Sequence, residues 1–141
     1  ADAFFARLRA RAARRSSARF PAALQSWLLD SEDLSLDALL ATMDVSRRQT
    51  DRLAKTYFGA SPKLLQRKYR ALKSGDRLLS GAARNWREAA GAGFFGQSHF
   101  LSGFRVFLGA TPGAFMERRN LAAYARGERL RSAGGHPLAG L

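Results

Sequence analysis

Apolar residues recur every three or four positions along most of this chain, which is the spacing of one face of an α-helix. The apolar positions of successive segments are Leu24, Trp27 and Leu28; Leu36, Leu39, Leu40 and Met43; Leu64, Leu65, Tyr69 and Leu72; Phe100, Phe104 and Phe107. Trp86, Ala89 and Ala90 form a weaker stripe of the same kind. The pattern predicts an all-α fold of about seven helices, with the aromatic stripe and both tryptophans in the core.

Local signals predict where several of these helices begin and end. Pro21 suits the first turn of a helix, and Ser35 and Ser46 are suited to cap the helices that follow them. We expect a helix over 47–58 that stops at Gly59, because glycine tolerates the left-handed conformation that ends helices. Ser61 and the proline after it then predict a long connector helix over about 62–79.

The second half of the chain repeats the plan of the first. The sequence YFGASP at 57–62 recurs as FLGATP at 107–112, so Gly109 follows Gly59 by 50 positions. Each of these two motifs follows a polar segment, 46–56 in the first half and 97–106 in the second. A short run of apolar residues at helical spacing, and then a tight turn, precede each polar segment. This order is typical of a helix-turn-helix unit. We therefore predict two such subdomains, 21–60 and 81–124, joined by a connector at 61–80.

The two ends of the chain have a different composition. Residues 1–20 contain six arginines and one acidic residue, and residues 125–141 are rich in Arg, Gly and Pro. We interpret 1–20 as a linker or N-terminal helix, and the first residue, Ala rather than Met, suggests a longer protein. A transit peptide or a membrane-surface helix is the alternative for this segment. For 125–141 we expect a flexible tail.

The charge balance points to a polyanionic partner. There are 24 Lys and Arg against 11 Asp and Glu, a formal net charge of +13, and nucleic acid is the commonest partner for such a chain. No cysteine is present, and the two histidines, His99 and His136, are far apart, so we expect no metal and no cofactor. We find no nucleophile–base set or paired carboxylates, so an enzyme is not expected. No apolar run approaches the ~18 residues of a membrane span.

The repeated unit closely resembles the DNA-binding domain of the AraC/XylS family of bacterial transcription regulators. The second unit carries the resemblance as GFFGQSHF at 93–100, Phe104-Arg105, and GATP at 109–112; the first carries it as Leu39-Leu40, VSRR at 45–48, Arg52 and GASP at 59–62. The resemblance covers about residues 22–116 and implies two helix-turn-helix lobes joined by a long helix. It implies double-stranded DNA as the partner and a bacterial cytoplasmic, nucleoid-associated location. It also allows contact with RNA polymerase and dimerisation through a missing upstream domain.

The second unit departs from the family pattern at several places, and Trp86 lines up with the family's leading aliphatic residue only if one position is deleted before Gly93. Ser102 stands where an arginine is common, Gly96 replaces the usual acidic residue of the turn, and Gly103 lies inside the predicted helix. Glycine at an interior helix position costs about 1 kcal/mol relative to alanine. The second unit is therefore the weaker candidate for reading bases.

Helix-turn-helix proteins read bases with the first residues of their second helix. The base-reading candidates are Arg47, Arg48 and Gln49 in the first unit and Gln97, Ser98 and His99 in the second. Arg can fork onto guanine and Gln can pair with adenine, whereas the simpler interpretation of each is a solvated surface residue. For His99 the two interpretations are equally favoured. The phosphate-binding candidates are Ser46, Arg52, Lys55, Ser102 and Arg105.

Three functions remain open at this point. The favoured one is a sequence-specific DNA-binding transcription regulator with two recognition helices in successive major-groove segments. The first alternative is a nonspecific nucleic-acid or polyanion-binding helical module, in which binding is nearly all counterion release. The second is an interaction or membrane-surface module that works through the arginine-rich N-terminus.

Overall fold

The computed structural model describes residues 2–32, 34–43 and 45–134, and this part of the chain is all helical. Its elements are α1 (Asp2–Asp30), α2 (Leu36–Thr42), α3 (Arg47–Phe58), α4 (Pro62–Ser80), α5 (Trp86–Ala90), the 3-10 helix η1 (Gly91–Gly93), α6 (Gln97–Leu108) and α7 (Pro112–Gly134). The predicted all-α fold with a long connector is confirmed.

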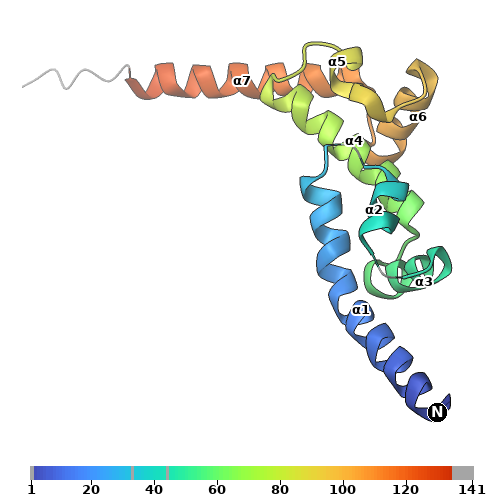
Figure 1. Ribbon diagram of the computed structural model, residues 1–141. Helices are drawn as coiled ribbons and strands as arrows, with labels where there is room; N and C mark the ends of the chain where they lie inside the picture. The colour runs from blue at the N-terminus through green and yellow to red at the C-terminus, as the bar shows by residue number, and fades with distance from the viewer. Residues whose placement is uncertain (1, 33, 44, 135–141) are drawn as a thin grey trace, which may run out of the picture.

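Helix α4 connects the two lobes of the molecule and packs against both. The C-terminal part of α1 with α2 and α3 packs around one end of α4 and forms the first lobe; α5, η1, α6 and the start of α7 pack around the other end and form the second lobe (Figure 1). The remaining parts of α1 and α7 extend away from the lobes in different directions (Figure 1). With 19 residues, α4 is about 28 Å long, enough to carry one lobe at each end.

Each lobe has its own hydrophobic core, and α4 contributes to both. In the first lobe Phe20, Leu24 and Leu28 of α1 are buried together with Leu53 of α3, and α4 adds Leu65. Apolar burial at helical spacing is therefore what holds α3 in place.

The second core is built mainly from aromatic rings. Phe100 and Phe104 of α6 are fully buried, their ring centroids lie 5.5 Å apart, and Leu78 of α4 joins them. Phe115 of α7 meets Phe104 edge to face at 5.3 Å, a favourable arrangement of two rings. Phe107 is only half-buried, and the Arg67 guanidinium lies 5.9 Å from its ring centre. In the aromatic stripe, Phe100 and Phe104 therefore belong to the core, whereas Phe107 lies at the surface and is partly covered by Arg67.

The predicted helix ends of the two units are confirmed. Ser35 and Ser46 cap α2 and α3, and α3 ends at Gly59, which has φ +71°. Helix α6 covers 97–108 as predicted and ends at Gly109, which has φ +69°. These ends follow local rules, because a cap side chain and a left-handed glycine act within one turn of the helix.

Two expectations about the chain ends are wrong. Pro21 does not begin a helix; it lies inside α1, which runs continuously from Asp2 to Asp30. Proline removes one helical hydrogen bond and commonly bends a helix, and α1 changes direction partway along its length (Figure 1). At the other end α7 continues past Ala125 to Gly134, because Ala, Arg and Leu favour helix, while residues 135–141 of the expected tail, with His136, lie outside the described residues.

Candidate nucleic-acid interface

Helix α3 begins with a complete capping box. The Ser46 hydroxyl accepts a hydrogen bond from the Gln49 backbone N–H at 3.2 Å, and the Gln49 side-chain oxygen accepts one from the Ser46 backbone N–H at 3.0 Å. These two bonds satisfy N–H groups that a helix start leaves without partners. The capping box therefore stabilises the first turn of α3 and defines the backbone positions from which its side chains extend.

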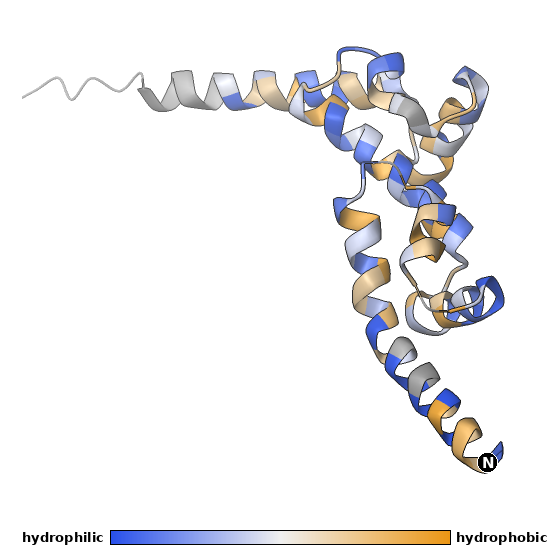
Figure 2. Ribbon diagram, in the orientation of Figure 1, coloured by the Kyte–Doolittle hydropathy of each residue, from blue (hydrophilic) through white to orange (hydrophobic). Residues whose placement is uncertain are grey.

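The outer face of α3 is a stripe of three cations. Arg48, Arg52 and Lys55 are exposed and fall at i, i+4 and i+7, so they share one face. Thr50, Leu53 and Ala54 are buried on the opposite face. Figure 2 shows α3 as strongly hydrophilic over the part furthest to the right. We call these three positive residues the α3 outer stripe.

The structure separates the three base-reading candidates of the first unit. Arg48 lies in the outer stripe, whereas the Arg47 guanidinium pairs with the Asp37 carboxylate of α2 at 2.8 Å. That exposed pair joins the two helices of the unit and adds at most a modest stability. Gln49 is half-buried and its side-chain oxygen is used in the capping box. Of the three, Arg48 is exposed and, among the described residues, takes part in neither the ion pair nor the capping box.

Helix α6 carries an outer stripe at equivalent positions. Ser98, Ser102 and Arg105 are exposed, and each follows its counterpart in α3 by 50 positions. Phe100, Gly103 and Phe104 are buried on the inner face, again with the same offset. The two helices therefore present the same face, but the α6 outer stripe has two hydroxyl groups where α3 has two arginines.

Two aromatic rings flank His99 at the start of α6. The Phe94 ring centre lies 5.9 Å and the Phe95 ring centre 6.3 Å from the imidazole centre. Phe94 also packs edge to face on Phe100 in the core at 5.0 Å, whereas 91% of Phe95 is exposed. The exposure of Phe95 was not predicted from the sequence. A signal for it was present in the sequence: Phe94 and Phe95 are adjacent in a turn, and both cannot enter the same core.

The helix starts also differ in charge. The first helix of each unit has an acidic residue in its first turn, Asp37 in α2 and Glu88 in α5, while α3 and α6 have none. The N-terminus of a helix carries a partial positive charge that favours anions. In α3 and α6 this charge is not offset by a side chain of the first turn and is available to a phosphate group.

Helices α3 and α6, which carry the two outer stripes, lie on the same side of the molecule (Figure 1). Helices α3 and α6 sit at the right-hand side of Figure 1, one below the other, while the long end of α7 extends to the left. A family model described as a helix-turn-helix domain, of the AraC type, matches residues 39–118, more than half of the chain. The chain belongs to the AraC/XylS family. Its AraC-type domain begins within α2 and ends in α7, so it contains both outer stripes and all of α4.

The AraC-type domain makes the chain a DNA-binding protein of the transcription-regulator class. No curated protein sequence and no solved structure matches the chain. Within 2–32, 34–43 and 45–134, no group of three or more His, Cys, Asp or Glu side chains is placed to hold a metal ion. None of the helices in these ranges has the length and apolar character needed to cross a membrane.

Proposed function

We propose that the protein is a sequence-specific transcription regulator that places α3 and α6 in two successive major-groove segments of one DNA site. The observation that supports this most strongly is the repeated outer stripe. Two helices with identical bounds at a 50-residue offset present equivalent faces from one connector helix. A recognition helix must be held by its inner face and exposed on its outer face, and both conditions hold for α3 and α6.

The two helices contribute differently in this proposal. Arg48 reads a base, with guanine the best match for its guanidinium, and Arg52 and Lys55 bind phosphates and orient the protein. Lys55 also pairs with Asp51 at 2.7 Å, an exposed bond that a phosphate can replace. In the second unit Gln97 and Ser98 read bases, His99 is positioned by the rings beside it, and Ser102 and Arg105 bind phosphates.

The wider role follows the family. We expect no enzymatic activity, a bacterial cytoplasmic protein near the nucleoid, and regulation through RNA polymerase and an upstream dimerising domain. These expectations rest on the family resemblance and on the charge of the chain.

Selection from a random double-stranded DNA library at about 150 mM salt tests the proposal, because phosphate-only binding weakens steeply as salt rises. We expect enrichment of a site with two short conserved blocks about 10 base pairs apart, one helical turn of DNA. A single conserved block would mean that only one helix reads bases. Tight binding at low salt without any enrichment would overturn specificity and leave a nonspecific polyanion binder.

A further inference from the structure

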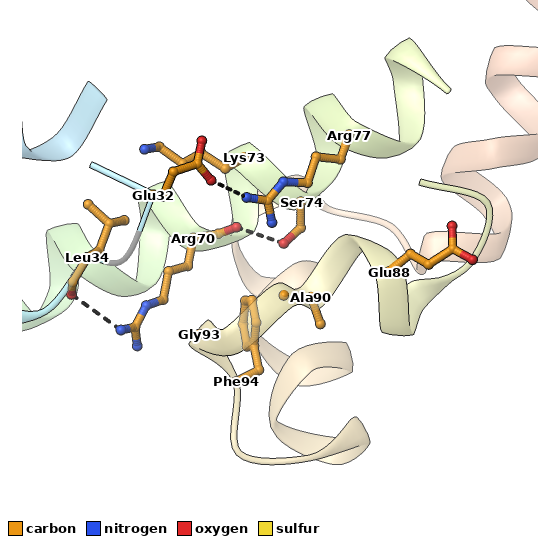
Figure 3. Close-up of a pocket in the computed structure, with 11 residues that line it drawn as sticks. Glu32, Leu34, Arg70, Lys73, Ser74, Arg77, Glu88, Ala90, Gly93 and Phe94 are labelled. Carbon is orange, nitrogen blue, oxygen red and sulfur yellow. Dashed lines mark hydrogen bonds and ion pairs between the residues drawn. The ribbon is translucent and has the colours of Figure 1, made fainter. Parts of the chain in front are cut away.

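Three cations on one face of α4 lie between the two lobes. Arg70, Lys73 and Arg77 border a cavity of about 390 Å³. Glu32 and Leu34, from the connection between α1 and α2, line the cavity from the first lobe, and Gly91, Gly93 and Phe94 line it from the second. Figure 3 shows Arg70 and Arg77 extending from α4, with their guanidinium groups at Leu34 and Glu32 of the first lobe.

Arg77 joins the two lobes through a single guanidinium group. One of its terminal nitrogens pairs with the Glu32 carboxylate at 3.1 Å, and the other donates to the Ala89 carbonyl of α5 at 3.3 Å. The Arg77 side chain is 32% exposed and the Glu32 side chain 93% exposed, so only the arginine end of this ion pair is partly withdrawn from water. The two bonds reach opposite lobes, and both require the guanidinium in one orientation.

Arg70 makes a second connection of the same kind. It donates to the Leu34 carbonyl of the first lobe at 3.3 Å. On the other side it lies against Gly93, where an added Cβ would come within 3.0 Å of the Arg70 Nε. An added Cβ at Gly91 would likewise come within 2.9 Å of an Arg77 nitrogen. Because Gly91 and Gly93 have no side chain, the Arg77 and Arg70 side chains can occupy the space beside them.

Lys73 is a natural comparison within the same face. Its ammonium donates to the Ser31 carbonyl of the first lobe at 2.5 Å. Among the described residues it makes no hydrogen bond or ion pair to the second lobe. Lys73 and Arg77 lie four positions apart, and replacing either one by a neutral residue removes one positive charge. Of these two residues, only Arg77 has partners in both lobes.

We propose that Arg70 and Arg77 act as an inter-lobe clasp that sets the distance and rotation between α3 and α6, and hence the spacing of the two DNA blocks. The clasp holds the segments that lead directly into the two units: Glu32 and Leu34 precede α2, and Gly93 precedes α6. The two arginines are positioning residues, since they act through the lobes and not on bases. The inference rests on the proposed two-block function.

The test measures spacing preference with the full chain. A selected two-block site is prepared with the blocks at the preferred spacing and one base pair closer or further apart, which moves the second block by ~3.4 Å and rotates it by about 34°. The ratio of Kd values between spacings is then compared for the wild type, Arg77→Met and Lys73→Met. Both variants lose one positive charge, so a general loss of attraction to DNA cancels in this ratio.

The clasp predicts that Arg77→Met lowers the spacing preference at least about threefold, the scale of one lost hydrogen bond, while Lys73→Met leaves it unchanged. Equal preferences in the wild type and Arg77→Met would overturn the clasp, and equal losses in both variants would do the same. If the wild type selects no two-block site at all, the proposed function itself fails, which is a separate result.

Further variants keep the test valid if Arg77→Met does not fold. Arg77→Lys keeps the charge but cannot reach both partners from one planar group, so it is expected to weaken the spacing preference. Gly93→Ala keeps every charge and requires the Arg70 side chain to shift by a few tenths of an ångström, so a smaller loss of spacing preference is expected than for Arg77→Lys. A folded Arg70→Met protein with unchanged spacing preference would exclude Arg70 from the clasp.

Discussion

Gly103 gives a prediction whose sign and size follow from the structure. It lies in the middle of α6 on the buried face, and a Cβ added there would meet the Phe94 ring at 3.6 Å, an ordinary van der Waals contact. Alanine is favoured over glycine inside a helix by about 0.8–1.0 kcal/mol. The added methyl group is also buried, which contributes up to about 0.8 kcal/mol. We therefore expect Gly103→Ala to raise the free energy of unfolding by about 1–1.5 kcal/mol.

The matched control is the same substitution six positions later. Gly109 has φ +69°, in the left-handed region where a side chain costs roughly 1–2 kcal/mol, so Gly109→Ala should destabilise the protein. No atom lies within 4 Å of its added Cβ, so the loss comes from the backbone alone. Opposite signs for identical substitutions inside α6 and at its C-cap would show that the backbone conformation of each glycine decides the effect.

Urea and thermal unfolding measure both changes. Trp86 packs on Phe100 with 5.8 Å between ring centres, so its fluorescence follows the second lobe once Trp27 is replaced by phenylalanine. For a chain of this size, 1 kcal/mol corresponds to a Tm change of about 3–5 °C. A Gly103→Ala protein that is less stable than the wild type would refute the reasoning, because it would mean that α6 lies closer to Phe94 than the contact distance allows.

Three further substitutions test separate parts of the account. Ser46→Ala removes the hydroxyl that accepts from the Gln49 N–H and should lower the free energy of unfolding by about 1 kcal/mol; an unchanged urea midpoint would show that the cap is dispensable. Arg52→Ala should reduce the slope of log K against log salt in DNA titrations by about 0.9, whereas Arg126→Ala, on the extended part of α7, should leave it unchanged. Equal slopes in all three proteins would exclude Arg52 from phosphate binding. Phe100→Ala should cost about 3–5 kcal/mol in calorimetry, because the ring is fully buried, and a loss below about 1 kcal/mol would contradict its place in the core.

The sequence was sufficient for features that depend on neighbouring residues. The bounds of α3 and α6 follow from a cap or turn at one end and a left-handed glycine at the other, all within a few positions. The two-lobe plan followed from the repeat itself. The continuous α1 did not follow, because burial of Phe20, Leu24 and Leu28 in one core outweighs the local effect of Pro21.

The candidate site was predicted as a set of residues but not as a surface. Arg47 pairs with Asp37, ten positions earlier, and the Gln49 side-chain oxygen accepts a hydrogen bond from Ser46. These contacts determine which of the candidate side chains remain exposed for DNA. The bond between Arg77 and Glu32 joins residues 45 positions apart and has no signal in the local pattern. Such contacts depend on how the lobes pack on α4, which spacing along the chain does not encode.

The measurement that tests the central claim most directly is a base-by-base comparison of two single variants on the selected site. Arg48→Ala removes a candidate reader from α3, and Ser98→Ala removes the equivalent residue from α6. Kd values are measured for the site and for each single base-pair change in both blocks. We expect Arg48→Ala to remove discrimination in one block only, by about 1–3 kcal/mol for a bidentate contact, and Ser98→Ala to remove it in the other block only, by about 0.5–1.5 kcal/mol for a single hydrogen bond. Uniform weakening across both blocks by both variants would contradict the claim that α3 and α6 each read one segment of DNA.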